Sequence, residues 1–252
     1  MLPMVDDWLF YALAVPAVVL LGLSKGGFAG MGALAMPMLA FVIDPVRAAA
    51  ILLPILIAQD AVGVWAFRRT VDWPLLAWMM PGSILGVWLG YVFAASLSAV
   101  TVMAMVGAIS IIFGLYRIWT ERHSLPPQVR RWPEWVGSLF GIASGYTSQI
   151  AHAGQPPFQI WVLPRKLGRD QLIGTTALYF AALNWIKVPA YVALGQFSRA
   201  NLLTSAALFP LAILSTFAGV WLVRRVPAER FYTAIHWLMV LVGAGLVWEA
   251  MA

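Results

Sequence analysis

The sequence predicts an all-α polytopic membrane protein made of two inverted-topology repeats with broken or re-entrant helices. The chain has 252 residues, of which 62% are hydrophobic and only 10% are charged. Soluble domains carry about a quarter charged residues, so a soluble core of this size would lack a polar surface. Apolar segments recur along the whole chain, and two places within them carry clusters of small and polar residues. We therefore expect residues 1–252 to form a single transmembrane domain.

Hydrophobic segments define the elements of this domain. A full crossing needs about 20 apolar residues, and fewer than about 15 indicates a half-helix or re-entrant segment. The second, sixth and seventh segments are short, so each is a half-helix, part of a re-entrant hairpin, or a short crossing. The predicted segments are 8–24, 28–43, 46–67, 74–95, 99–118, 135–150, 155–163, 171–194, 200–223 and 231–250.

Several function classes are excluded by composition. The chain contains no cysteine, which excludes disulfides, thiol catalysis and cysteine-based metal sites. No histidine and carboxylate spacing suits a metal and no phosphate-binding loop is present, so we expect no metal and no cofactor. The segments recur throughout, so none is a cleavable signal peptide. The net charge of +6 reflects basic loops that orient the chain, and we expect no nucleic-acid partner.

The first break interrupts the long apolar run 9–43 at a lysine with glycines around it. Backbone leaves helical geometry at membrane depth only where protein or a water-filled cavity receives its polar groups. Lys25 either binds an anion, assisted by free backbone N–H groups, or snorkels to the interface or pairs with an acid. Ser24 would donate a hydrogen bond to the anion. Gly26 and Gly27 either let backbone approach a ligand or serve tight helix packing.

The second break, 144–157, lies about half a chain later. Thr147, Ser148, Gln149 and Gln155 surround His152 there and could donate hydrogen bonds to a substrate. His152 is either a packed, hydrogen-bonded residue or a substrate ligand that also moves protons. Paired breaks in two halves are typical of a secondary transporter site near the membrane midplane.

Matched residues indicate that the two halves are related. Residues 81–90 and 210–219 share Pro, Ile, Leu and a final Gly at one constant offset. The glycines and proline at 22, 26 and 37 likewise fall opposite those at 141, 145 and 156. We expect repeat 1 over about 8–118 and repeat 2 over about 135–250, joined by a basic cytoplasmic connection, 119–134.

The distribution of basic residues supports the inversion, because five segments per repeat give the repeats opposite orientations. Placing Arg68-Arg69 in the cytoplasm leaves only Arg47 and Arg199 outside, apart from two lysines within segments. Both termini then lie outside. We expect a multi-pass protein of a bacterial-type inner membrane.

Three further polar residues lie within predicted segments. Asp60 either pairs with Lys25 or Arg68, sits near the interface as a solvated anchor, or accepts a proton that couples transport to a pH gradient. Asn184 and Lys187 are three residues apart and share one helical face. Lys187 is either a second cation for the anion or an interfacial anchor, and Asn184 would donate a hydrogen bond.

At these residues the chain resembles TauE/SafE family permeases, the sulfite and organosulfonate exporter group, over nearly its full length. The resemblance implies a secondary transporter that exports a small sulfur-containing anion, such as sulfite or sulfoacetate, with an ion gradient as driving force. The second break departs from the glycine-rich pattern of the first, with Ser148 and His152 where glycine is expected. The motifs are Gly26-Gly27-x-x-Gly30-x-Gly32 with Pro37 and Leu39, Pro81 with Gly90, His152-Ala153-Gly154-x-Pro156-Pro157, Leu163-Pro164, Gly174-Thr175-Thr176, Asn184-x-x-Lys187-x-Pro189-x-Tyr191, and Leu194-Gly195.

Two alternative functions stay open at this point. A passive anion channel would use the same breaks without alternating access. An intramembrane enzyme would use His152 and Asp60 as acid and base, but no serine nucleophile motif or metal-ligand set supports it, so we do not expect an enzyme. The expected partners are a small anionic substrate and the lipid bilayer, and a homo-oligomer is left open.

Overall fold

The computed structural model describes residues 7–28, 30–94, 96–122, 132–223, 225 and 229–251. In this part of the chain all regular structure is helical, with no strand, which confirms the predicted all-α class. Two short 3-10 helices, η1 (Met31–Leu34) and η2 (Leu163–Arg165), accompany the α-helices. The α-helices are α1 (Trp8–Lys25), α2 (Ala35–Ala40), α3 (Pro45–Phe67), α4 (Trp73–Ala94), α5 (Ala99–Arg122), α6 (Val136–Ala151), α7 (Gln155–Val162), α8 (Arg169–Ala193), α9 (Arg199–Leu222) and α10 (Glu229–Met251).

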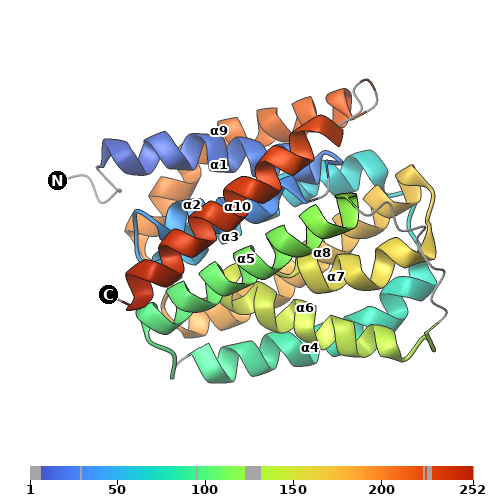
Figure 1. The fold of residues 1–252 in the computed structure, drawn as a ribbon, viewed down its shortest axis with the longest axis horizontal. Helices are drawn as coiled ribbons and strands as arrows, with labels where there is room; N and C mark the ends of the chain where they lie inside the picture. The colour runs from blue at the N-terminus through green and yellow to red at the C-terminus, as the bar shows by residue number, and fades with distance from the viewer. Residues whose placement is uncertain are drawn as a thin grey trace.

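Every predicted segment corresponds to one α-helix, with ends that agree to within a few residues, except that segment 28–43 holds both η1 and α2. The short second and seventh segments are half-helices. η1 and α2 together run from Met31 to Ala40, about 15 Å, and α7 is about 12 Å long. Both are far shorter than the hydrocarbon core of a bilayer, which is about 30 Å thick. Figure 1 shows α1 with α2, and α6 with α7, as hairpins whose second arm is short.

The surface of the bundle has the character of a membrane protein. Five helices, α1, α3, α4, α5 and α9, are long and apolar enough to cross a membrane by length and composition. Large apolar side chains are exposed along them, and tryptophans such as Trp8, Trp73 and Trp248 are exposed near helix ends. Polar side chains such as Gln59, Asp60 and Lys187 are buried inside. The protein is therefore a polytopic membrane protein.

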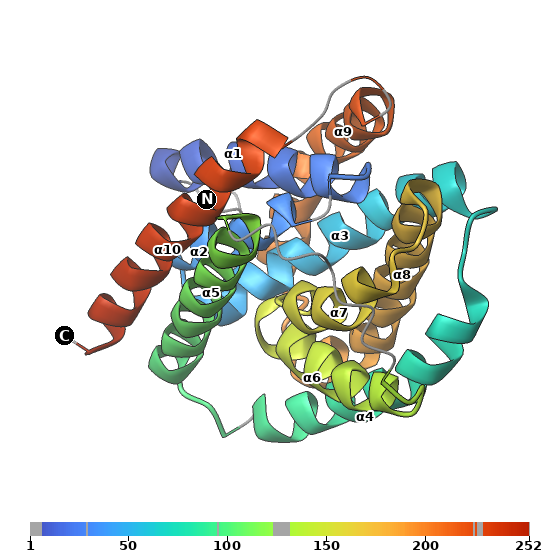
Figure 2. The same ribbon diagram turned by 45° about the vertical axis from the view of Figure 1, so that its right-hand side comes forward.

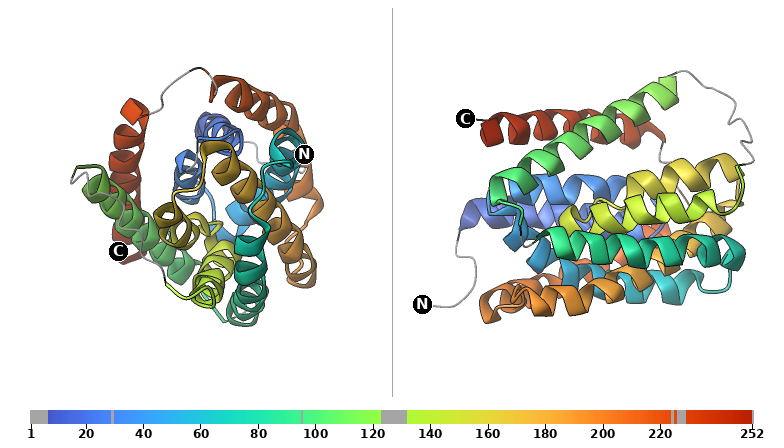
Figure 3. Two further views of the ribbon diagram at one scale, coloured as in Figure 1. Left: turned by 90° about the vertical axis from the view of Figure 1, so that its right-hand side faces the viewer. Right: turned by 90° about the horizontal axis from the view of Figure 1, so that it is seen from below.

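The helices lie along one common direction, and α5 and α10 form a pair along one side of the bundle (Figures 2 and 3). α1 begins and α10 ends at the same end of the molecule (Figure 1). This agrees with the prediction that both termini lie on one side of the membrane.

Close glycine contacts set two of the helix pairs. A Cβ atom at Gly26, which directly follows α1, would lie 2.5 Å from the backbone of Gly219 in α9. A Cβ atom at Gly145 of α6 would lie 2.2 Å from the carbonyl oxygen of Ser83 in α4. Three of the residues matched between the two halves of the sequence, Gly26, Gly145 and Gly219, thus lie where α1 meets α9 and α6 meets α4. Exchanging the halves converts one pair into the other, so this packing supports the repeat, which stays a prediction.

The described basic loops gather at two ends of the bundle. Thr70 Oγ1 donates to the carbonyl oxygen of Asp170 at 2.8 Å, which places the Arg68-Arg69 loop beside the loop before α8. At the other end, Arg47 Nε donates to Asn201 Oδ1 at 3.2 Å, close to Arg199. This grouping is the one expected from the charge distribution. Part of the basic connection, residues 123–131 with Arg130 and Arg131, lies outside the described residues, as does Arg224.

Candidate functional site

The first break is a change of backbone direction between Lys25, the last residue of α1, and η1. Gly27 and Gly30 have φ angles of 128° and 104°, in the left-handed region that favours glycine. Gly26 has an ordinary helical φ of −73° and packs against Gly219. Gly27 and Gly30 therefore supply the turn, whereas Gly26 supplies a helix contact.

The second break starts at His152, which follows α6 with a φ of 51°. Its N–H donates to the Ser148 carbonyl at 3.1 Å, and the N–H of Ala153 donates to the Thr147 carbonyl at 3.2 Å. His152 is thus the left-handed residue that ends α6, a position where glycine is the usual residue. Ser144 Oγ donates to the carbonyl of Gly154 at 2.7 Å and ties α6 to the start of α7. The side-chain contacts of His152 with Lys187 and Ala49 explain why histidine rather than glycine occupies this position.

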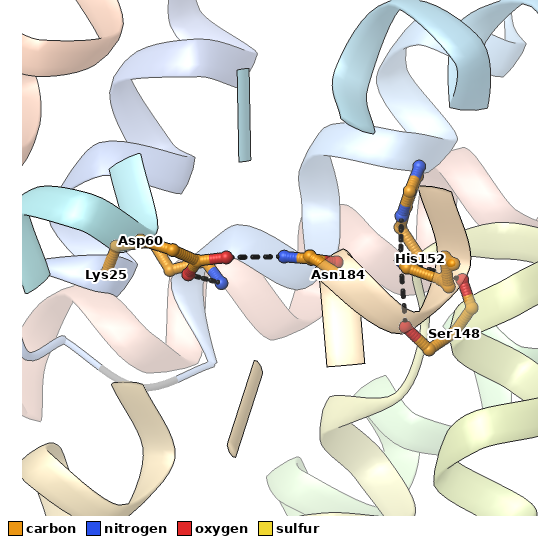
Figure 4. A network of polar contacts seen from close by, with 6 residues as sticks. Lys25, Asp60, Ser148, His152 and Asn184 are labelled. Carbon is orange, nitrogen blue, oxygen red and sulfur yellow. Dashed lines mark hydrogen bonds and ion pairs between the residues drawn. The ribbon is translucent and has the colours of Figure 1, made fainter. Parts of the chain in front are cut away.

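A buried ion pair lies next to the first break (Figure 4). Lys25 Nζ is 2.5 Å from Asp60 Oδ1, and the side chains are 10% and 2% exposed. Asn184 Nδ2 donates to the other carboxylate oxygen, Oδ2, at 2.6 Å. The ring centroid of Phe180 is 5.3 Å from Lys25 Nζ and adds a cation–π contact. Of the partners considered from sequence, Asp60 thus takes Lys25 rather than Arg68.

A second polar cluster joins α8 to the second break. Lys187 is completely buried, and its Nζ lies 2.8 Å from His152 Nδ1, 3.1 Å from Ser148 Oγ and 3.3 Å from the Ser148 carbonyl. His152 Nε2 lies 2.9 Å from the carbonyl oxygen of Ala49 in α3. Because a carbonyl only accepts, Nε2 carries the ring proton and Nδ1 accepts from Lys187. Lys187 therefore holds the His152 ring in one tautomer, and no ion pair of Lys187 occurs among the described residues.

The contact between Asp60 and Asn184 fits the predicted repeat, because the two residues occupy equivalent positions in their helices. Asp60 and Asn184, which contact each other, are each the sixteenth residue of their helices, α3 and α8. The breaks themselves lie at different levels along α3. The backbone of Lys25 lies beside Gly63 of α3, whereas His152 reaches Ala49, about 21 Å further along that helix. An inversion about an axis in the membrane plane places equivalent breaks on opposite sides of the midplane, so only residues near the axis can touch.

A cavity of about 50 Å³ connects the two breaks. Its lining comes from α1, the first turns of η1–α2 and α7, the second break, and α3, α5, α8 and α10. Six of the residues predicted from sequence line it: Ser24, Lys25, Ser148, His152, Gln155 and Asn184.

The other predicted residues lie outside this lining. Asp60 and Lys187 stand behind it and contact residues that do line it. Thr147 Oγ1 donates to the carbonyl of Ala143 within α6. Gln149 packs against Gly90 of α4. Gly26 and Gly27 face α9 and Val223 respectively.

Sequence reasoning missed most of the other lining residues, among them Phe180, Ser110 and Met239. Each occupies a position within a long apolar helix where a phenylalanine, serine or methionine is unremarkable in a membrane protein. No local pattern distinguishes them from lipid-facing or packing residues. Their place in the cavity depends on how α8, α5 and α10 cross the other helices.

Comparison with protein-family models identifies the chain. The model described as Sulfite exporter TauE/SafE matches residues 14–246, nearly the whole sequence. The chain belongs to the TauE/SafE sulfite exporter family. This confirms the resemblance seen in the motifs.

Membership of the TauE/SafE family makes the chain a membrane transporter and not an enzyme. The match spans both breaks and both polar clusters, so these lie within the family's common region. Searches among curated proteins and among solved structures found no match. Within the described residues, no three histidine, aspartate or glutamate side chains are grouped to hold a metal ion.

Proposed function

We propose that this TauE/SafE protein exports a sulfite-sized anion across the inner membrane by alternating access, coupled to an ion gradient. One observation carries the proposal. The cavity that connects the two breaks is lined by Lys25, whose ammonium forms the buried ion pair with Asp60. A small anion there would exchange water for a buried positive charge and several hydroxyl and amide groups.

The size of the cavity favours a compact substrate. A space of about 50 Å³ accepts a few water molecules, since one needs on the order of 10–15 Å³ on this measure. Sulfite, a single sulfur with its oxygens, is of this scale. Sulfoacetate is larger and carries a second charged group, so it would need more room and a second cation. Sulfite is therefore the preferred substrate among the sulfur-containing anions.

The staggered breaks suit alternating access rather than a permanent pore. The first lies towards the end of the bundle with Arg68-Arg69, and the second towards the end with Arg47 and Arg199. Rocking one repeat against the other would open the cavity first towards one break and then towards the other. A passive channel needs a hydrated path through the whole bundle, and a cavity for a few waters favours the carrier.

Flux measurements test the proposal. Purified protein in lipid vesicles should take up sulfite with saturating kinetics, and sulfite trapped inside should accelerate uptake by exchange. The double variant Lys25→Met/Asp60→Asn, which removes the cation without leaving a buried charge, should lose this flux. Lys166→Met, an exposed lysine in the loop before α8, is the matched control and should keep it. Equal flux in the double variant and the control, or flux without saturation, would overturn the proposal.

A further inference from the structure

The charge balance of the buried site has a consequence for transport. Without substrate, the Lys25 ammonium and the Asp60 carboxylate neutralise each other at 2.5 Å. A substrate anion that enters the cavity would compete with Asp60 for Lys25. With Lys187 as a neutral amine, the form that burial without a carboxylate partner favours, the site would then hold two negative charges against one positive charge. An uncompensated charge in a dry interior is costly, so a second positive charge has to enter with the anion.

We propose that Asp60 is the proton-binding group of this transporter, so that each monovalent anion crosses with one proton in an electroneutral step. Export then runs down the concentration gradient of the anion, and a more acidic outside opposes it. This rests on the proposed function, because it assumes that the anion binds in the cavity at Lys25. On binding, a proton from the water on the open side forms an O–H bond with Asp60. On release, that bond breaks and the proton returns to water on the other side.

Asn184 decides which carboxylate oxygen takes the proton. Its Nδ2 group donates to Oδ2 at 2.6 Å, and this oxygen keeps its partner throughout. Oδ1 is the oxygen held by Lys25, and it loses that partner when the anion takes the ammonium. Protonated Oδ1 would then point towards the anion as a hydrogen-bond donor. The neutral carboxyl group and the anion–ammonium pair together restore zero net charge.

The other ionisable groups near this site do not suit the role. Lys187 and His152 contact each other, and His152 Nε2 is already committed to the Ala49 carbonyl. A second proton on the His152 ring would have to bind Nδ1, directly against the Lys187 amine 2.8 Å away. On α5, α6 and α9, which also pack against α3, no described ionisable side chain contacts Asp60. Asp60 is also the only carboxylate among the buried side chains of the described residues.

Electroneutral coupling has a distinct signature. A pH gradient drives accumulation of the anion, and membrane potential does not change the rate, because no net charge crosses. In Asp60→Asn the ammonium of Lys25 stays free of a carboxylate. The anion then crosses without a proton, carries its own charge, and follows the potential instead.

The experiment uses protein in lipid vesicles and methanesulfonate, an anion that does not take up protons at neutral pH. Wild-type protein should accumulate it when the outside is acidic, with about one proton entering per anion by a trapped pH dye. A potassium–valinomycin potential should leave that rate unchanged. Asp60→Asn should lose pH-driven accumulation by tenfold or more and gain uptake driven by an inside-positive potential. Wild-type uptake that follows the potential, or pH-driven accumulation that persists in Asp60→Asn, would overturn the inference.

A second variant keeps the test decisive if Asp60→Asn does not fold. Asn184→Ala removes the hydrogen bond to Oδ2 of Asp60, which favours the neutral carboxyl over the carboxylate. The pH of half-maximal uptake should therefore rise. Asn201→Ala, which alters a buried amide at the Arg47 end of the bundle, should leave that pH unchanged. An unshifted pH profile in Asn184→Ala would count against Asp60.

The two proposals fail in different ways. If neither sulfite nor methanesulfonate enters vesicles containing the wild-type protein, the proposed function fails and the coupling falls with it. If both anions enter and no proton accompanies methanesulfonate, the transporter stands and only the role of Asp60 is wrong.

Discussion

Removing the Lys25 ammonium should destabilise the protein unless the Asp60 carboxylate is removed as well. In Lys25→Met the carboxylate, 2% exposed, keeps only the Asn184 amide as a partner. Breaking a buried ion pair from one side costs about 3–5 kcal/mol, because the remaining charge has no counter-ion. In the double variant Lys25→Met/Asp60→Asn no charge remains, and an amide can still accept from Asn184. We expect the double variant to recover more than half of the lost free energy of unfolding.

The assay is unfolding by sodium dodecyl sulfate in mixed micelles, followed by the fluorescence of the 13 tryptophans. Lys166→Met is the control and should change the free energy of unfolding by less than about 0.5 kcal/mol, as exposed substitutions do. Two results would refute the reasoning. Lys25→Met could prove as stable as Lys166→Met, or the double variant could prove as unstable as the sum of Lys25→Met and Asp60→Asn.

Three further predictions concern the second break, the helix contacts and the topology. His152→Gly should be more stable than His152→Ala by about 1 kcal/mol in the same assay. Both variants lose the imidazole ring, but only glycine adopts the left-handed backbone conformation without strain. Equal stability of the two variants would contradict this. Gly26→Ala should lower stability by about 1–3 kcal/mol because its Cβ would lie 2.5 Å from Gly219, whereas Gly168→Ala, with open space around it, should have little effect. The chain has no native cysteine, so single cysteines at Arg68 and Arg199 should react with an impermeant maleimide from opposite sides of the membrane; labelling from one side would refute the orientation.

Helix positions followed from sequence because membrane depth leaves few choices. A backbone segment in hydrocarbon has to satisfy its own hydrogen bonds, so length and hydropathy alone mark each helix. The half-helices were visible for the same reason, since segments 28–43 and 155–163 are too short and too rich in glycine or proline for a full crossing. The glycine motifs stood out in the sequence, but the sequence did not distinguish glycines that pack against a helix from glycines that form a turn. Gly26 and Gly27 are neighbours, and only the structure shows that one packs against α9 while the other provides a left-handed turn.

The sequence predicted which residues belong to the candidate site better than it predicted how they are arranged. Lys25, Asp60 and Lys187 stood out because charged residues at membrane depth are few. Their distribution over two separate clusters did not follow from sequence. Asp60 had three possible roles, and the packing of α1 on α3 selected the ion pair with Lys25. Lys187 was expected at the substrate or at an interface, and the structure places it behind His152.

What the sequence determined by itself is therefore the list of parts: an all-helical membrane chain, two broken places, and a handful of buried polar groups. Tertiary structure decided which of those groups touch, since the contacts join residues as far apart as Asp60 and Asn184. The physical reason is that helix formation in a bilayer depends on local hydrogen bonding, whereas the approach of two polar side chains depends on how closely helices pack. At this site the close approach is made at Gly63 of α3, where a Cβ atom would lie 3.1 Å from the carbonyl oxygen of Lys25 and 3.7 Å from Ala177 of α8, and only the assembled bundle reveals it.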